Sequence, residues 1–139
     1  MAQGTTSFPT ALDAARTNPS NMDSSEAAIL AMQARMGVVT EYAADGAIAT
    51  AAGIAVLTKG SAGAYTLAAP TTDGDRLCVT SATAFAHVVT ATDLIHDGVT
   101  GGAKDTATFG AFAGASMDLV AYDGKWHVVA KNVVTIAAA

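Results

Sequence analysis

The stretch that decides the fold runs Ser116-Met117-Asp118-Leu119-Val120-Ala121-Tyr122-Asp123-Gly124-Lys125-Trp126-His127-Val128-Val129-Ala130. Asp123-Gly124 is a dipeptide that tolerates the positive φ angles of a two-residue type I′ turn. Apolar runs flank the dipeptide on both sides, and this pattern predicts a β-hairpin. The hairpin also holds the only tryptophan of the chain, Trp126, whose large apolar surface we expect to be buried.

Working outward from the hairpin, short apolar runs alternate with turn signals at the spacing typical of a sandwich or barrel. The expected strands are Ile54–Thr58, Ala64–Ala68, Arg76–Thr80, Ala86–Thr90, Thr106–Phe112, Met117–Tyr122, Lys125–Ala130 and Val133–Ile136. Strands do not alternate with helices here, so a parallel α/β sheet is not expected. We predict a mainly β chain whose residues 54–139 form a compact antiparallel β-sandwich or barrel-like domain.

The segment before this domain contains one expected helix, residues 23–37. Asp23 and Glu26 have the spacing of a capping box, and Gly37 is a suitable C-terminal stop. Ile29, Met32 and Met36 follow at spacings of three and four, which makes a short apolar seam. The seam suits either an interchain bundle with an oligomer interface at these three residues or a helix lying on its own domain. Residues 38–53 are rich in alanine and glycine and are expected to be a connector with at most one short strand.

Residues 1–22 are small and polar, and their apolar anchors are Phe8 and Leu12. They predict an extended arm that is ordered by another surface, with a plain disordered tail as the alternative. Alanine supplies 33 of the hydrophobic residues, which together make up 51% of the chain. Bulky core residues are therefore modest in number, and a thin core of this kind is often stabilised by oligomerisation.

Charge and composition exclude several classes of protein. The formal net charge is −5 and there is no run of lysine or arginine, so nucleic-acid binding is not expected. No apolar stretch reaches the length of a membrane span, and the N-terminus lacks the features of a signal peptide. The single cysteine, Cys78, excludes a disulfide within the chain and is expected to be a small core residue. These features predict a soluble protein made in a reducing compartment.

The residues that could carry chemistry do not form a catalytic pattern. His87 and His127 lie inside expected strands among apolar neighbours, as satisfied or surface histidines do. His96 lies in a loop region with Asp93, Asp97 and Asp105, but the spacing matches no zinc, calcium or facial-triad motif. We expect no enzyme activity, no metal and no cofactor.

Several segments together carry a resemblance to a known family. They are Gly63–Pro70, Asp73–Leu77, Ser81–Thr90, Ala107–Gly110 and Gly114–Trp126, and they resemble the C-terminal domain of head fibre and capsid decoration proteins of tailed bacteriophages. Ser7–Asp13 and Ile29–Gly37 are similar to the N-terminal segments of phage virion appendage proteins. The spacer before the helix is shorter here than is often found in those proteins.

The resemblance implies a structural virion protein, commonly trimeric, on the outer capsid surface. It implies that the chain is made in the cytoplasm of the bacterial host and that its partner is the major capsid protein. Phe8, Pro9 and Leu12 are then the expected capsid-binding residues. Two alternatives stay open: a tail-fibre or baseplate component, and a carbohydrate-binding β module with weak glycan binding through Tyr65, Tyr122 or Trp126.

Overall fold

The computed structural model describes Ser25, residues 27–29 and the continuous stretch 37–139. Ser25 and residues 27–29 are helical, inside the helix expected over residues 23–37. Ile29 is helical and 57% exposed. The other residues expected to contact the capsid or a second chain lie outside the described residues: Phe8, Pro9, Leu12, Met32 and Met36. Gly37–Ala139 forms a compact unit of its own.

The described residues contain ten strands, which form one sheet with the shape of a nearly closed barrel. They are β1 (Val39–Tyr42), β2 (Gly46–Ile48), β3 (Gly53–Leu57), β4 (Ala64–Leu67), β5 (Arg76–Ser81), β6 (Val88–His96), β7 (Lys104–Phe109), β8 (Ser116–Tyr122), β9 (Lys125–Asn132) and β10 (Val134–Ala137). The mainly β fold is confirmed, and each expected run corresponds to a strand. Two further strands, β1 and β2, lie in the segment expected to be a connector, so the domain begins well before residue 54.

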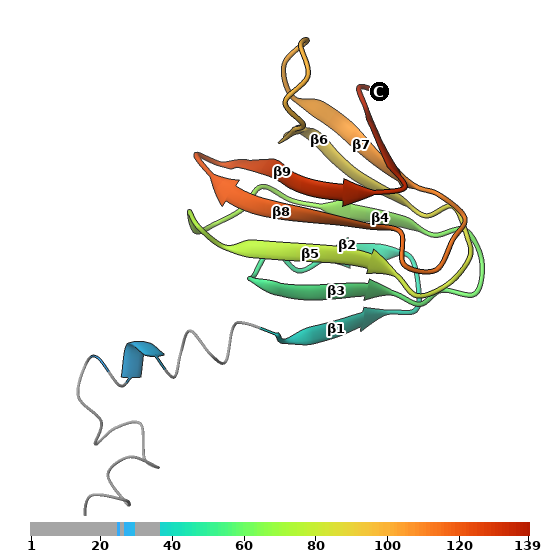
Figure 1. The fold of residues 1–139 in the computed structure, drawn as a ribbon, viewed down its shortest axis with the longest axis horizontal. Helices are drawn as coiled ribbons and strands as arrows, with labels where there is room; N and C mark the ends of the chain where they lie inside the picture. The colour runs from blue at the N-terminus through green and yellow to red at the C-terminus, as the bar shows by residue number, and fades with distance from the viewer. Residues whose placement is uncertain (1–24, 26, 30–36) are drawn as a thin grey trace, which may run out of the picture. The chain divides into compact units, whose positions relative to one another are not determined.

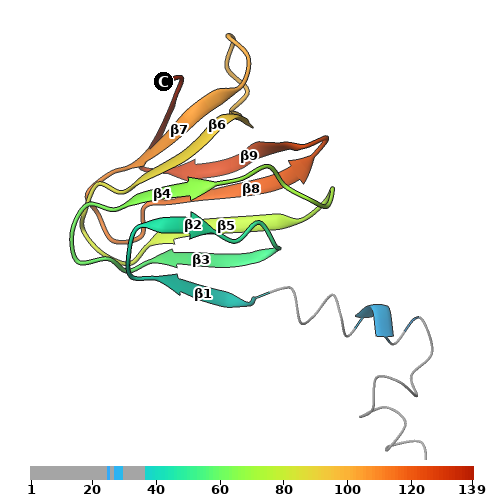
Figure 2. The ribbon, with the colours of Figure 1, turned by 180° about the vertical axis from the view of Figure 1, so that it is seen from behind.

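The strands from β1 to β6 alternate between two sides of the barrel. Each strand from β1 to β5 is followed by a crossing to the opposite side, so each strand from β1 to β4 pairs in parallel with the strand two places along the chain. This arrangement joins β1, β3 and β5 on one side and β2, β4 and β6 on the other. Figure 1 shows β1, β3, β5 and β8 side by side, and Figure 2 brings β2 and β4 to the front.

This parallel pairing corrects the expectation of an antiparallel domain. Parallel strands need a crossover connection, and here a strand on the opposite side supplies it without a helix. Turn residues such as Gly60 and Gly63 end a strand equally well whether the chain turns back or crosses over. The sequence pattern therefore located the strands without giving their direction.

The strands after β6 pair mostly antiparallel, as predicted. Asp123 and Gly124 join β8 to β9 and have φ angles of 50° and 71°, the positive values that a type I′ turn requires. Trp126 is fully buried, and its Nε1–H donates to the carbonyl of Ala68 at 2.8 Å. The predicted hairpin and the predicted burial of its tryptophan are both confirmed.

The core fills the space between the two sides of the barrel. Its largest fully buried side chains include Trp126, Tyr65, Phe109 and Met117, and alanines such as Ala55 and Ala107 complete it. One side is joined to the other through β9 and β6, which are paired in register at only two positions, Ile95 with Trp126 and His96 with His127. This short contact is called the seam below.

Candidate functional site

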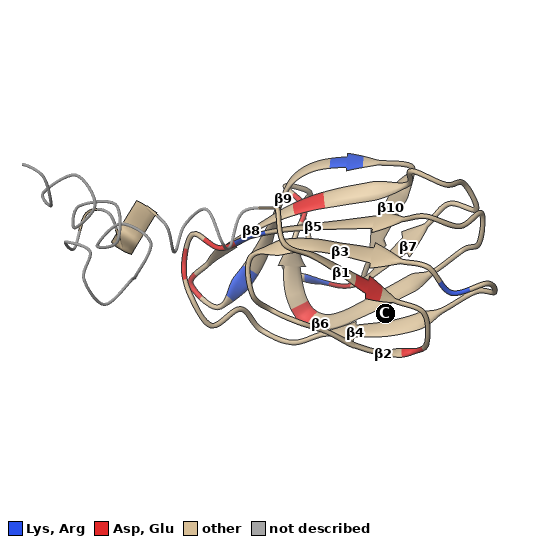
Figure 3. Cartoon of the chain, turned by 90° about the horizontal axis from the view of Figure 1, so that it is seen from below, with Lys and Arg blue, Asp and Glu red and all other residues tan. Residues whose placement is uncertain are grey.

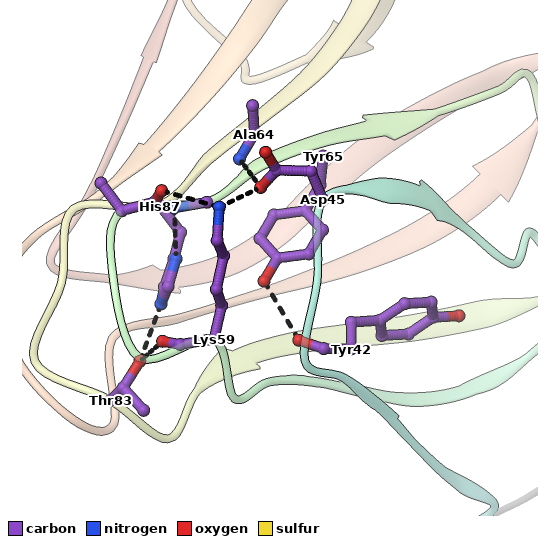
Figure 4. A network of polar contacts seen from close by, with 9 residues as sticks. Tyr42, Asp45, Lys59, Ala64, Tyr65, Thr83 and His87 are labelled. Carbon is purple, nitrogen blue, oxygen red and sulfur yellow. Dashed lines mark hydrogen bonds and ion pairs between the residues drawn. The ribbon is translucent and has the colours of Figure 1, made fainter.

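A network of polar contacts lies where the chain crosses from one side of the barrel to the other (Figure 4). Its members follow the carboxyl ends of the parallel strands β1, β3 and β5, or face those ends from β4. The carboxyl ends of parallel strands meet at one edge of a sheet, so residues far apart in sequence come together there. We call this group the crossing network; it consists of Tyr42, Asp45, Lys59, Tyr65, Thr83 and His87.

His87 is one of the two fully buried members of the network, together with Tyr65. Its Nδ1 accepts the backbone N–H of Gly63 at 3.0 Å, and its Nε2 lies 2.9 Å from the hydroxyl of Thr83. That hydroxyl donates to the carbonyl of Lys59 at 2.9 Å, so Nε2 carries the proton and the imidazole is neutral. Burial, and then the charge of Lys59, lower the pKa of His87. The expectation of a satisfied histidine is confirmed at this position.

The rest of the network binds backbone as well. The Lys59 ammonium lies 2.7 Å from the Asp45 carboxylate, which also accepts the N–H of Ala64 at 2.9 Å. These hydrogen bonds, that of Lys59 first, lower the pKa of Asp45. Tyr65 donates its hydroxyl to the carbonyl of Tyr42 at 3.1 Å, and burial raises the pKa of Tyr65. Each polar group fixes a crossing segment, so the network holds the parallel strands together.

Gly63 is required at its place in the network. A Cβ atom at this position would lie 2.6 Å from Cε2 of Tyr65, too close for any other residue without displacing the ring. The buried backbone of Gly63 therefore passes directly against Tyr65 while its N–H reaches His87. The close approach explains the glycine without any ligand.

A second group of side chains forms a row across β8, β9 and β6 near the seam. The rings of Tyr122 and His127 are 6.0 Å apart between centroids, and those of His127 and His96 are 5.1 Å apart. Tyr122 is 61% exposed, and both histidines are partly buried. His96 and His127 are direct partners in the parallel register, a pairing of distant residues that the sequence did not reveal.

Two of the aspartates considered with His96 as metal ligands, Asp93 and Asp105, instead form hydrogen bonds or ion pairs within the domain. The Asp105 carboxylate accepts the N–H groups of Ala139 and Asp93, at 2.7 and 2.6 Å, and these bonds lower its pKa. The Asp93 carboxylate lies 3.5 Å from the Lys125 ammonium. Within the described residues, no three histidine, cysteine or acidic side chains are grouped so as to hold a metal ion.

Cys78 does not lie in the core, contrary to the expectation. Leu77 and Val79 on either side of it are buried, so the alternation of the strand places Cys78 on the outer face, where it is half-buried beside its register partner Asp118. Burial, and then the hydrogen bond with Asp118, raise the pKa of the thiol to about 11. The thiolate is the reactive form of cysteine, so this thiol is a poor nucleophile at neutral pH.

The three aromatic residues considered for glycan binding differ in their exposure to solvent. Tyr65 and Trp126 are 1% and 0% exposed and so present no surface to a ligand. Tyr122 is the member of that set whose ring is open to solvent. A carbohydrate-binding module built on these three residues therefore has one exposed ring, next to the two histidines.

One groove was not anticipated from the sequence. It has a volume of about 470 Å³ and is open to solvent; it is lined by Ala86, Thr108, Phe109, Gly110, Lys131, Val133, Val134 and Thr135. Val133 has a φ angle of 56°, an unusual conformation for a branched side chain, and is 51% exposed. The nearby Lys131 ammonium donates to the carbonyl of Val134. Neither the turn signals nor the apolar pattern of the sequence marks this feature.

Charged residues are spread over separate strands and loops of the described part of the chain (Figure 3). Its lysines and arginine lie apart in sequence, at Lys59, Arg76, Lys104, Lys125 and Lys131. Among the described residues there is no helix of the length and hydrophobicity needed to cross a membrane.

No protein-family model matches this chain, and no curated protein matches it either.

Proposed function

We propose that the chain is a capsid decoration, or head fibre, protein that binds the outer surface of a tailed-bacteriophage capsid as a trimer. The observation that supports the proposal is that the polar side chains of the crossing network form hydrogen bonds to the backbone of the domain itself. The crossing network ties its side chains to the backbone of neighbouring segments, and every buried polar side-chain atom of the described residues has a hydrogen-bond partner. These polar groups therefore hold the strands in place, which is the role expected of them in a structural module.

The resemblance of the β-domain segments to phage head fibre proteins supports the same role. In this account residues 1–22 attach to the major capsid protein through Phe8, Pro9 and Leu12, and the domain that starts at Gly37 projects from the shell. The apolar side chains of the helix, Ile29, Met32 and Met36, form the interface that joins three chains. The virion surface is then the location of the protein.

Deletion of residues 1–22 tests the attachment. We expect the truncated chain to lose binding to isolated capsids in a co-sedimentation assay, while the buried Trp126 keeps its native fluorescence. Phe8→Ala combined with Leu12→Ala should weaken binding in the same direction. The matched control is Thr5→Ala with Thr6→Ala, which removes no apolar anchor and should bind as the unmodified chain does. Capsid binding that survives the deletion would contradict the proposed arm.

Light scattering tests the trimer. The unmodified chain should have about three times its chain mass of 13.8 kDa at micromolar concentration. Ile29→Asp combined with Met32→Asp should convert the trimer to a monomer, because two carboxylates cannot be buried unpaired in an apolar helix interface. A monomeric unmodified chain would contradict a trimer that forms away from the capsid.

One observation keeps carbohydrate binding as a second candidate. Tyr122 presents 61% of its surface to solvent next to His127, and such a ring can stack on a sugar. Binding on a glycan array that is lost in Tyr122→Ala and kept in Tyr122→Phe would favour this candidate. Absence of glycan binding by the unmodified chain would exclude it.

A further inference from the structure

His96 and His127 occupy a special place in the barrel, because they form one of the two register pairs of the seam between β6 and β9. The other pair, Ile95 and Trp126, is fully buried. Successive residues of a strand point to opposite faces, so the two imidazoles both lie on the outer face. Two distant segments of the chain thus place equivalent rings next to each other on adjacent strands.

The two imidazoles also have their nitrogens available. Within the described part of the chain, neither imidazole has a hydrogen-bond or ion-pair partner; their aromatic contacts are with each other and, for His127, with the Tyr122 ring. His87 differs, because both of its ring nitrogens are hydrogen bonded inside the crossing network. Both seam histidines are partly buried and therefore still reach solvent.

The spacing of the rings suits chelation. A tetrahedral ion with metal–nitrogen bonds of about 2.0–2.1 Å holds the centres of two imidazoles roughly 5 Å apart. The centroids of His96 and His127 are 5.1 Å apart, with an angle of 32° between the ring planes. The strands already supply the separation, so side-chain rotations alone can turn one nitrogen of each ring toward a shared ion.

We propose that His96 and His127 form a two-ligand site for a transition-metal dication such as Zn²⁺, Ni²⁺ or Cu²⁺. Imidazole nitrogen selects these ions over Mg²⁺ and Ca²⁺, which prefer oxygen ligands. Water molecules complete the coordination, because the described residues provide no third protein ligand in the group. The site is independent of the capsid role proposed above.

A bound ion would act as a cross-link at the join of the barrel that has the fewest register pairs. The seam has only two register pairs, whereas β8 and β9 share seven. An ion held by one ligand from β6 and one from β9 would oppose separation of the two strands. Because the unfolded chain does not hold the two histidines together, binding must favour the folded state.

The test uses the full chain, freed of any affinity tag and treated with a chelator. Isothermal titration with NiCl₂ and ZnCl₂ should give one ion per chain, and each ion should raise the thermal unfolding midpoint. His96→Gln and His127→Gln should each weaken binding at least tenfold and abolish the rise in midpoint. Tyr122→Phe, which keeps the neighbouring ring, is the matched control and should bind as the unmodified chain does.

Two results would overturn the proposal. One is an unmodified chain that binds neither ion and whose unfolding midpoint does not change when they are added. The other is a double variant, His96→Gln with His127→Gln, that binds as tightly as the unmodified chain. Circular dichroism of each variant without metal shows whether the fold is intact, so lost binding can be separated from lost structure.

Discussion

Strands β1 to β6 and strands β7 to β10 belong to the same barrel but are joined to their neighbours in different ways. The first group, called the parallel half, pairs across crossings that bring together residues far apart in sequence. The second group, called the hairpin half, includes β8 and β9, which are joined by a two-residue turn and paired over seven register positions. The comparison shows that one chain uses local turn chemistry in one half and a side-chain network in the other.

The difference has a physical cause. A hairpin turn positions its two strands by backbone geometry alone, once the turn residues accept positive φ angles. A crossing does not position its strands by turn geometry, and those of its backbone groups that are removed from water need other hydrogen-bond partners. The crossing network provides them, since Lys59, Gly63 and Ala64 all have backbone groups that bond to its side chains.

The largest effect is expected where the two halves meet. Trp126→Ala should lower the free energy of unfolding by about 3–5 kcal/mol, because it empties a fully buried site. It also leaves the carbonyl of Ala68, in the connection after β4, without its indole donor. Denaturant unfolding measures the loss. A change within about half a kcal/mol would show that the ring does not bridge the halves.

The next largest effect tests the parallel half. His87→Ala removes the acceptor of the buried Gly63 N–H and the partner of Thr83, which should cost about 2–3 kcal/mol in the free energy of unfolding. Asp45→Asn is the matched control in the same network. Its ion pair with Lys59 is 54% exposed on the Asp45 side, so this variant should lower the free energy of unfolding clearly less than His87→Ala does. Equal losses in the two variants would contradict the role given to His87.

His87 also predicts a dependence on pH. Its pKa is lowered in the folded state, so the unfolded state binds the proton more readily. The stability that neutral His87 contributes is complete above the unfolded pKa of about 6.5 and is lost as the pH falls toward the lowered folded-state value. The difference in unfolding free energy between the unmodified chain and His87→Ala should therefore shrink between pH 7.5 and pH 5. A difference that stays constant over this range, or grows as the pH falls, would be the opposite result.

The smallest effect tests the hairpin half. Gly124→Ala should cost about 1–2 kcal/mol, because φ at Gly124 is 71° and a Cβ atom there meets nothing within 4 Å. The loss would therefore be one of backbone conformation alone. Asp123→Asn keeps a dipeptide that suits a type I′ turn and should leave stability nearly unchanged in the same denaturation assay. A neutral Gly124→Ala would mean that the turn does not direct this hairpin.

The hairpin half was the more predictable from sequence for the same reason. Asp123-Gly124 and the runs beside it encode their pairing locally, and burial of Trp126 follows from its size. The direction of β3 and β5 is set by contacts between residues in different crossings, and turn residues do not encode it. Residues 38–53 were expected to hold at most one short strand, and the signal for β2 was weak because Gly46 and Ala47 have little strand propensity and take their place by pairing with β4.

The candidate sites divide in the same way. His87 could be identified as a satisfied histidine from its apolar neighbours, but its partner Gly63 could not, because Gly63 lies in a different crossing, 24 residues earlier in the chain. The His96–His127 pair depends on parallel register across the seam, which has no local signal. Cys78 was assigned to the core because its neighbours are apolar. The alternation of β5 instead turns the thiol outward.

The central claim, proposed above, is that this domain decorates the outer surface of a bacteriophage capsid. The most direct test is a cryo-EM map of the particles that carry this chain. The account predicts density for residues 37–139 on the outside of the capsid shell, in groups of three, with residues 1–22 in contact with the major capsid protein. Density for the domain on the tail or baseplate, or particles that lack it, would contradict the claim.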